Sequence, residues 1–239
     1  MISGGDFHEL RVNGNSNSQR VTLSGGTFDT VKRGNQYSSI IAPADLLKDG
    51  YVFVNRDTDA KVSTSQKAAL TNVKVISEKT ANASASLTVN GTVTPYSTFE
   101  DALAAAQEQG GTLSLLADVN LSKQVNVNSG TFTLDLNGHT LTSGAANTMV
   151  VLGGSVTIQD SQGGGVISNA DSDIYCNAVW CSGGTVTVRS GSIMSKLRWG
   201  SGTVSLQGGA FRFLDSEGGS WLSAIPEGKA LKKEDDHSV

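Results

Sequence analysis

Long apolar runs, proline, cysteine, aromatic side chains and clusters of like charge are all scarce in this chain of 239 residues. The longest apolar stretch is far shorter than the ~20 residues that a membrane span needs, and the N-terminal segment lacks the apolar core of a signal peptide. No basic cluster is denser than Lys232-Lys233, and the net charge is −4. Because phosphate backbones are bound by basic patches, the sequence predicts neither nucleic-acid binding nor membrane insertion.

Only two cysteines occur, Cys176 and Cys181. Their spacing is neither a CxxC redox motif nor half of a zinc site with a second half elsewhere, so we expect no metal and no cofactor. Five positions apart on a straight strand they would face opposite sides, and a disulfide would need a corner near Asn177. A structural role is expected for both cysteines, with the bridge left open.

Glycine is abundant, with 28 residues, and so are Ser, Thr, Asn and Val. This composition favours strands joined by tight corners. Two internal repeats give the strands an order. An apolar-polar-Gly-Gly-x-Phe unit occurs at 2–7, 23–28 and 206–211, and a hydroxyl-apolar-hydroxyl-apolar unit occurs at 131–134, 155–158, 185–188 and 203–206. Intervals of 24, 30 and 18 residues in the second series are typical of coils with loop insertions.

The second repeat alternates strictly, which is the period of a strand with one buried face. The same side chain at the same position four times favours stacked parallel coils over hairpins. We therefore expect an all-β fold, a right-handed parallel β-helix (solenoid). Its buried positions should include Phe132, Leu134, Val156, Ile158, Val186, Val188, Val204 and Leu206. Thr157, Gln159, Thr187 and Arg189 should be exposed.

One short α-helix is expected at about 97–109, where it should cap the open end of the coils. Ser97 and Glu100 have the spacing of a capping box, and Gly110-Gly111 would end the helix. Its apolar face consists of Phe99, Ala102, Leu103 and Ala106. These positions follow the helical period, so they should lie against the core.

Three segments carry a family resemblance: 96–106 (YSTFEDALAAA), 111–119 (GTLSLLADV) and 134–141 (LDLNGHTL). They resemble the pectate-lyase-like β-helix repeat modules of Gram-positive bacterial cell-surface proteins, over about residues 96–231. The resemblance implies an extracellular place at the bacterial surface and contact with neighbouring repeats of the same parent chain. It also implies a host surface protein or glycan as ligand.

The resemblance divides the chain into three parts. Residues 1–55 would be the closing coils of a preceding repeat, 56–95 a polar, strand-prone connector, and 96–239 the helix-capped module. The edge at Ile2 would then need a cover. We expect it from Leu87 and Val89 of the connector or from another copy of the chain.

Enzymes occur on this fold, but glycosidic cleavage needs paired carboxylates and eliminative cleavage needs calcium-binding acids with a base. The outward column after the hydroxyls reads Asp135, Gln159, Arg189, Gln207 and contains one acid. His139, in an Asn-Gly-His sequence, is expected to be a corner residue, and Asp171 with Asp173 a solvated turn. We expect no catalysis; the alternative is a carbohydrate-active β-helix enzyme, a polysaccharide lyase or hydrolase.

The binding residues that we expect for an adhesin or scaffold module lie on loops and outward faces. They are Lys196, Arg198, Trp199, Trp180, Tyr175, Asp135 and Arg189. Trp199 beside Arg198 suits an interface anchor, or else the ring is folded over its own coil. A third hypothesis is ice binding by the repeated hydroxyls. Outward Thr is also what strand propensity selects, and the irregular intervals oppose a lattice match.

Overall fold

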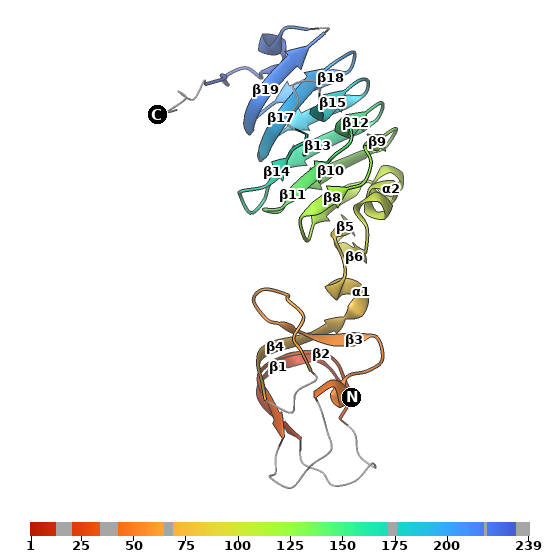
Figure 1. The fold of residues 1–239 in the computed structure, drawn as a ribbon, viewed down its shortest axis with the longest axis vertical. Helices are drawn as coiled ribbons and strands as arrows, with labels where there is room; N and C mark the ends of the chain where they lie inside the picture. Colours follow the sequence, from red (N-terminus) through yellow and green to blue (C-terminus); the bar gives the residue numbers. More distant parts are fainter. Residues whose placement is uncertain (13–20, 34–42, 65–68, 172–175, 218, 233–239) are drawn as a thin grey trace. The chain divides into compact units, whose positions relative to one another are not determined.

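The computed structural model describes residues 1–12, 21–33, 43–64, 69–171, 176–217 and 219–232. The protein is rich in β-structure and forms two compact units, Met1–Asn82 and Ala83–Val239 (Figure 1). Among the described residues, no helix has the length and apolar character needed to cross a membrane.

The first unit is built on one four-stranded sheet of order β1-β2-β4-β3. Its elements are β1 (Ile2–Val12), β2 (Leu23–Arg33), η1 (Pro43–Leu46), β3 (Tyr51–Asn55), β4 (Leu70–Ser77) and α1 (Glu78–Ala81). β1 and β2 run parallel with Phe7 opposite Phe28, and the two rings stack with centroids 5.1 Å apart. The 21-residue repeat of the sequence is therefore a repeat of neighbouring strands in register.

The expected connector at about 56–95 is divided between the two units. β4 pairs antiparallel with both β2 and β3, so it belongs to the first sheet. β5 (Ala85–Val89) and β6 (Thr92–Tyr96) belong to the second unit, where β5 pairs with β7 (Gly111–Leu115). The boundary is at Asn82 and Ala83 rather than near 55 and 95. Leu87 and Val89 thus belong to a strand that extends a sheet of their own unit.

The second unit contains two sheets. The seven-stranded sheet has the order β18-β16-β13-β10-β7-β5-β6 and is parallel from β7 to β18. Its remaining strands are β10 (Thr131–Asp135), β13 (Ser155–Gln159), β16 (Thr185–Val188) and β18 (Thr203–Leu206). Between successive parallel strands of this sheet the chain runs through the other sheet, and we call each such stretch a pass. Each pass returns the chain to this sheet, so the four hydroxyl-apolar repeats lie side by side.

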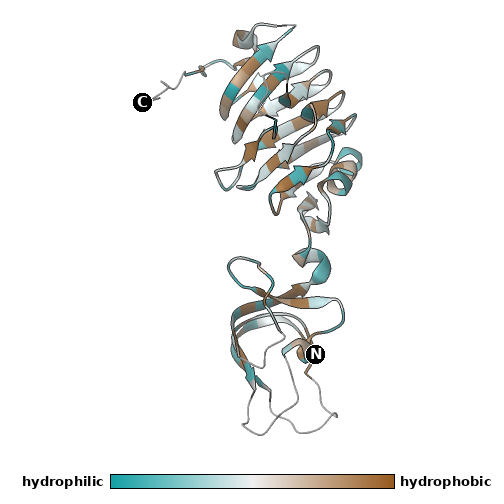
Figure 2. Ribbon diagram, in the orientation of Figure 1, coloured by the Kyte–Doolittle hydropathy of each residue, from teal (hydrophilic) through white to brown (hydrophobic). Residues whose placement is uncertain are grey.

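The eight-stranded sheet is parallel throughout, with the order β8-β11-β14-β17-β15-β12-β9 and with β19 paired to β17. Its strands are β8 (Val119–Leu121), β9 (Val125–Val127), β11 (Thr140–Ser143), β12 (Asn147–Val151), β14 (Val166–Ile167), β15 (Asn177–Cys181), β17 (Ser192–Trp199) and β19 (Ala210–Ser216). Apolar and polar segments alternate along the strands of both sheets (Figure 2).

One continuous apolar core joins the two sheets of the second unit. Each apolar position expected in the hydroxyl repeats is buried, at 4% exposure or less. Among the positions expected to be exposed, Arg189 is exposed, whereas Thr157, Gln159 and Thr187 are half-buried. The predicted inward face is confirmed, and neighbouring strands cover more of the outward side chains than the alternation indicates.

Helix α2 (Phe99–Gln109) begins one residue later than the sequence predicts. Its N-cap is Thr98, whose hydroxyl accepts a hydrogen bond from the Asp101 backbone N–H at 3.2 Å and donates to the Asp101 carboxylate at 2.7 Å. The helix is therefore capped by the Thr98 side chain rather than by Ser97, and Asp101 rather than Glu100 bonds to the capping residue. The expected apolar face is buried against β5, β7 and β10. A short 3-10 helix, η2 (Trp221–Ala224), contacts β18 at the other end of the seven-stranded sheet.

Candidate binding surface

Strands β15, β17 and β19 bring a tryptophan and four charged residues together. The register sets Trp180 opposite Arg198, and Arg198 opposite Asp215. Val179, Cys181 and Leu197 are fully buried, so the intervening Trp180 and Arg198 face outward, as the period of a strand requires. We call Trp180, Lys196, Arg198, Asp215 and Glu217 the Trp180–Arg198 patch.

The Arg198 guanidinium connects the patch. Its Cζ lies 5.1 Å from the centroid of the Trp180 ring, which is the geometry of a cation–π contact. The same guanidinium pairs with the Glu217 carboxylate. Beside it, Lys196 Nζ lies 3.6 Å from Asp215 Oδ2. Two cations face two anions, so the patch is locally neutral and presents an aromatic face with a fixed guanidinium.

Two buried donors in the patch have no hydrogen-bond partner among the described residues, Trp180 Nε1 and Arg198 Nε. Buried polar atoms in folded proteins are nearly always paired, and exceptions gather at functional places. The patch is therefore incompletely satisfied in its polar groups.

Trp199 lies outside the patch. Its ring is folded over neighbouring residues of its own unit, the second of the two roles considered for it. Its ring packs on the core and meets the Trp221 ring edge to face, with centroids 5.5 Å apart. Its indole Nε1 donates to the Gly202 carbonyl at 2.7 Å. These contacts give Trp199 a packing role within its own unit, and its role as a binding residue stays a prediction.

Asp135 also makes structural contacts. It is 7% exposed. One carboxylate oxygen accepts from the backbone N–H groups of Asn137 and Ser161, each at 3.0 Å, and the other accepts from Gln159 Nε2 at 3.2 Å. A carboxylate held by these donors fixes the turn after β10 and the equivalent turn of the next pass. These bonds give Asp135 a structural role, and its role as a ligand contact stays a prediction.

The other two expected contacts do not join the patch. Arg189 is exposed directly after β16, a strand of the seven-stranded sheet. Tyr175 lies outside the described residues. The structure thus brings together three of the expected residues, Trp180, Lys196 and Arg198.

Sequence reasoning missed Asp215 and Glu217. Each lies 19 residues after its cationic partner, Lys196 and Arg198 respectively. Nineteen residues is close to the shortest interval of the hydroxyl repeat, 18 residues. Opposite charges separated by about one repeat interval were the signal that would have found them.

The outer face of the seven-stranded sheet carries two columns of hydroxyl groups. Thr131, Ser155, Thr185 and Thr203 form one column in register, and Thr133, Thr157, Thr187 and Ser205 form the other. Thr112 and Thr88 on β7 and β5 extend the second column. Strand geometry sets these hydroxyl positions about 4.8 Å apart across the strands and roughly 6.6 Å apart along them.

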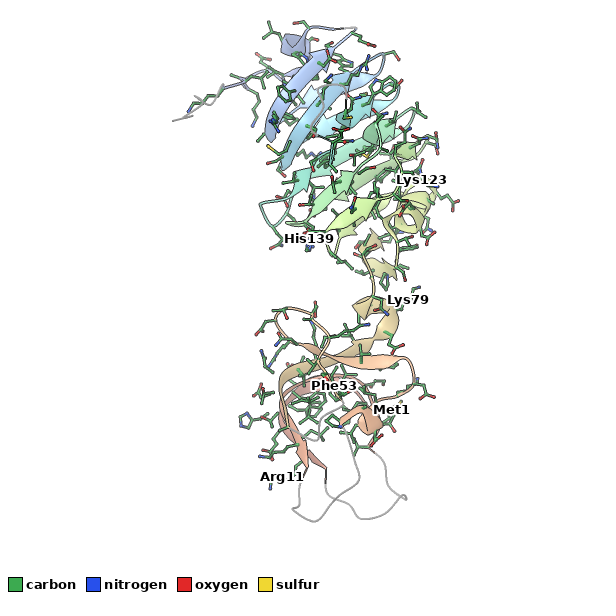
Figure 3. The ribbon with its side chains drawn as sticks, in the orientation of Figure 1. Met1, Arg11, Phe53, Lys79, Lys123 and His139 are labelled. Carbon is green, nitrogen blue, oxygen red and sulfur yellow. The ribbon has the colours of Figure 1, made fainter. Side chains whose placement is uncertain are left out.

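Acidic and histidine side chains do not converge in the described part of the chain, where no group of three His, Cys, Asp or Glu has metal-binding geometry. His139 follows the Asn137-Gly138 turn after β10, and its backbone N–H donates to the Leu136 carbonyl at 2.8 Å (Figure 3). Its ring lies 3.4 Å from the Asp118 carboxylate. Asp173 lies outside the described residues, so the Asp171-x-Asp173 pair is not tested.

The cysteines are thiols rather than halves of a disulfide. Cys181 is completely buried, and its Sγ lies 3.4 Å from the Gly183 carbonyl oxygen. Burial raises the pKa of this thiol from 9.0 to about 11. Cys181 is therefore an apolar core residue at neutral pH.

Comparison of the chain with protein-family models, curated proteins and solved structures finds no match.

Proposed function

We propose that this chain is a non-catalytic module of a bacterial cell-surface protein that binds a host protein or glycan through the Trp180–Arg198 patch. The observation that carries the proposal is the contact between the Arg198 guanidinium on β17 and the Trp180 ring on the neighbouring strand β15, where both side chains face outward. Tryptophan and arginine are the side chains that most often dominate protein interfaces. Aromatic rings with neighbouring hydrogen-bond donors also suit the faces and hydroxyls of sugars.

The fold in this proposal is a right-handed parallel β-helix. Support comes from strands that recur in parallel register at matching positions in successive passes of the chain. Such a stack is stiff, because each pass packs on its neighbours, and it presents outward side chains in fixed columns. Extracellular display at the bacterial surface follows from the sequence resemblance and is part of the same proposal.

The test is a glycan array together with capture of host serum and matrix proteins by the chain. A ligand should be found, and Trp180→Ala and Arg198→Ala should each weaken its binding. Arg189→Ala, a change of an exposed arginine on the other sheet, is the matched control and should leave binding unchanged. Failure of both screens, or a ligand held equally well by Trp180→Ala and the parent chain, would overturn the proposal.

A polysaccharide lyase or hydrolase is the alternative within the same fold. Asp135, the acid in the outward column, has both carboxylate oxygens committed to hydrogen bonds, which favours a non-catalytic role. We expect no unsaturated or reducing ends to be released from pectin, alginate or glycosaminoglycans. Release that disappears in Asp135→Asn, with the fold retained by circular dichroism, would establish the enzyme.

The hydroxyl columns support a second function, binding to ice or another flat lattice. Their register on consecutive strands gives a regular two-dimensional array of hydroxyls. Thermal hysteresis in cold solution tests this function directly. Activity that is lost in Thr157→Lys would favour the lattice function, and absence of hysteresis would remove it.

A further inference from the structure

β1 in the first unit and β19 in the second are edge strands within the described part of the chain, and they share one sequence motif. β1 is the last strand of its sheet, and β19 pairs only with β17. Both follow the apolar-polar-Gly-Gly-x-Phe motif, at 2–7 and 206–211. An open strand edge offers unpaired backbone donors and acceptors to a further strand.

The inward side chains of these two strands are only partly covered. Phe7 and Leu10 of β1 are half-buried, and so are Phe211 and Leu214 of β19. The matching positions on strands with neighbours on both sides are closed, since Phe28 and Val31 of β2 are 0% and 1% exposed. A strand added to each open edge would complete this burial. Beside them, Phe213 is 47% exposed on β19.

The backbones of the two edges match each other. Gly5 in β1, Gly26 in β2 and Gly209 before β19 have φ values of 100°, 101° and 97°, all in the region that favours glycine. The backbone at the second glycine of the motif is therefore alike in β1, in β2 and before β19. β1 has β2 as its parallel neighbour, so β19, which resembles β1, suits a neighbour that resembles β2, and β1 of another copy is such a strand.

Gly4 supplies an independent observation. Its counterparts in the motif are glycines because another backbone approaches them: a Cβ on Gly25 would lie 2.2 Å from the Ser3 carbonyl oxygen, and one on Gly208 would lie 2.2 Å from the Arg189 carbonyl oxygen. A Cβ on Gly4 would meet nothing within 4 Å, and the φ of Gly4 is outside the left-handed region. Gly4 is therefore a glycine at a motif position where the other copies of the motif make a close backbone contact, but the described residues of the single molecule make no such contact with it.

We propose that β19 of one molecule receives β1 of a second copy of this chain, in the parallel register that β1 and β2 already show. Phe211 would then lie opposite Phe7 of the second copy, and the Gln207 carbonyl would approach its Gly4 as the Ser3 carbonyl approaches Gly25. β18 ends at Leu206 and is already in contact with η2, so the contact with the second copy begins at the next residue, Gln207. Gln207, Gly209 and Ala210 are exposed and accessible.

Charge complementarity supports the same register. It places Arg11 of the second copy, the penultimate residue of β1 (Figure 3), opposite Asp215. The Arg11 side chain is 49% exposed and pairs with Glu9 at 2.9 Å within its own strand. Asp215 already pairs with Lys196. Arg198, Asp215 and Arg11 of the second copy would then lie opposite one another on three consecutive strands and alternate in sign, and cross-strand pairs of opposite charge stabilise a sheet.

The contact joins two different surfaces, so it is heterologous. Each copy offers one β19 edge and one β1 edge, and repeated contacts close into a ring or grow head to tail. This inference is independent of any ligand of the Trp180–Arg198 patch.

Sedimentation velocity of the full chain over a range of concentrations tests the proposal. The parent chain should form dimers and longer species as its concentration rises. Gly4→Ala should remain a monomer with an unchanged melting temperature, since a Cβ has open space there in the single molecule. Gly144→Ala is the matched control, because Gly144 also has nothing within 4 Å and no left-handed φ, and it should assemble like the parent chain.

A charge exchange tests the register itself. Arg11→Asp should raise the dissociation constant several-fold, and the double variant Arg11→Asp with Asp215→Arg should restore it. A parent chain that stays monomeric at every concentration would overturn the proposal, as would Gly4→Ala assembling as well as Gly144→Ala.

Discussion

At the scale of single residues, Val188 shows how strongly the core depends on each inward position. It is fully buried, and its neighbours on the adjacent strands are Ile158 and Leu206. Val188→Asp should lower the free energy of unfolding by several kcal/mol, because it places an unpaired charge in the stack. Thr187→Val, one position away on the outer face, should change it by less than ~1 kcal/mol. Chemical denaturation of both variants measures the contrast, and equal effects would show that the strand faces are assigned wrongly.

Cys181 couples the stability of the second unit to alkaline pH. The folded protein raises the pKa of this thiol from 9.0 to about 11, so between these values the folded chain holds a proton that the unfolded chain has released. Its stabilising effect is complete below pH 9 and is lost as the pH rises towards 11. Melting curves should show a steeper alkaline loss of stability for the parent chain than for Cys181→Ala. Parallel profiles would contradict the burial of the thiol.

At the scale of elements, glycines form a column at the corner before the seven-stranded sheet. Gly154 has φ +70°, and a Cβ there would lie 2.5 Å from the Gly130 carbonyl oxygen. The next pass repeats this contact, with a Cβ on Gly184 lying 2.6 Å from the Gly154 carbonyl oxygen. Successive corners approach so closely that a side chain has no room.

Alanine substitution separates this contact from backbone strain. Gly164 also has a left-handed φ, +85°, but a Cβ there meets nothing within 4 Å. Gly164→Ala should therefore cost only the conformational penalty, about 1 kcal/mol. Gly154→Ala carries the same penalty and the backbone clash, so its loss of stability in urea denaturation should be clearly larger. Similar losses would mean that the corners can move apart.

The molecule as a whole has two apolar cores that share no residue. Phe53 lies in the core of the first unit, and Leu134 in the core of the second. We expect two unfolding transitions in calorimetry of the full chain. Phe53→Ala should lower only one transition temperature and Leu134→Ala only the other, since each substitution costs about 2–5 kcal/mol in its own core. A single transition shifted by both variants would show that the units unfold as one.

The sequence alone determined the strands of the two repeats, the buried face of the hydroxyl repeat and the parallel alignment of the repeated units. It could do so because a strand's period is local, and because repeated units find equivalent neighbours when they stack. Phe7 opposite Phe28 and Val156 opposite Val186 follow from the repeat without any knowledge of distances. The helix was also readable from its apolar spacing, apart from its cap.

Only the tertiary structure decided the roles of individual polar and aromatic residues. Asp135 reads as an outward acid, yet backbone N–H groups of its own turn and of the next pass bury it. Trp199 and Trp180 are both plausible anchors in the sequence. Packing on Trp221 makes the first structural, and Arg198 makes the second the centre of the patch. These outcomes depend on which residues 19 to 30 positions away come close in the fold, and the hydropathy pattern does not record that approach.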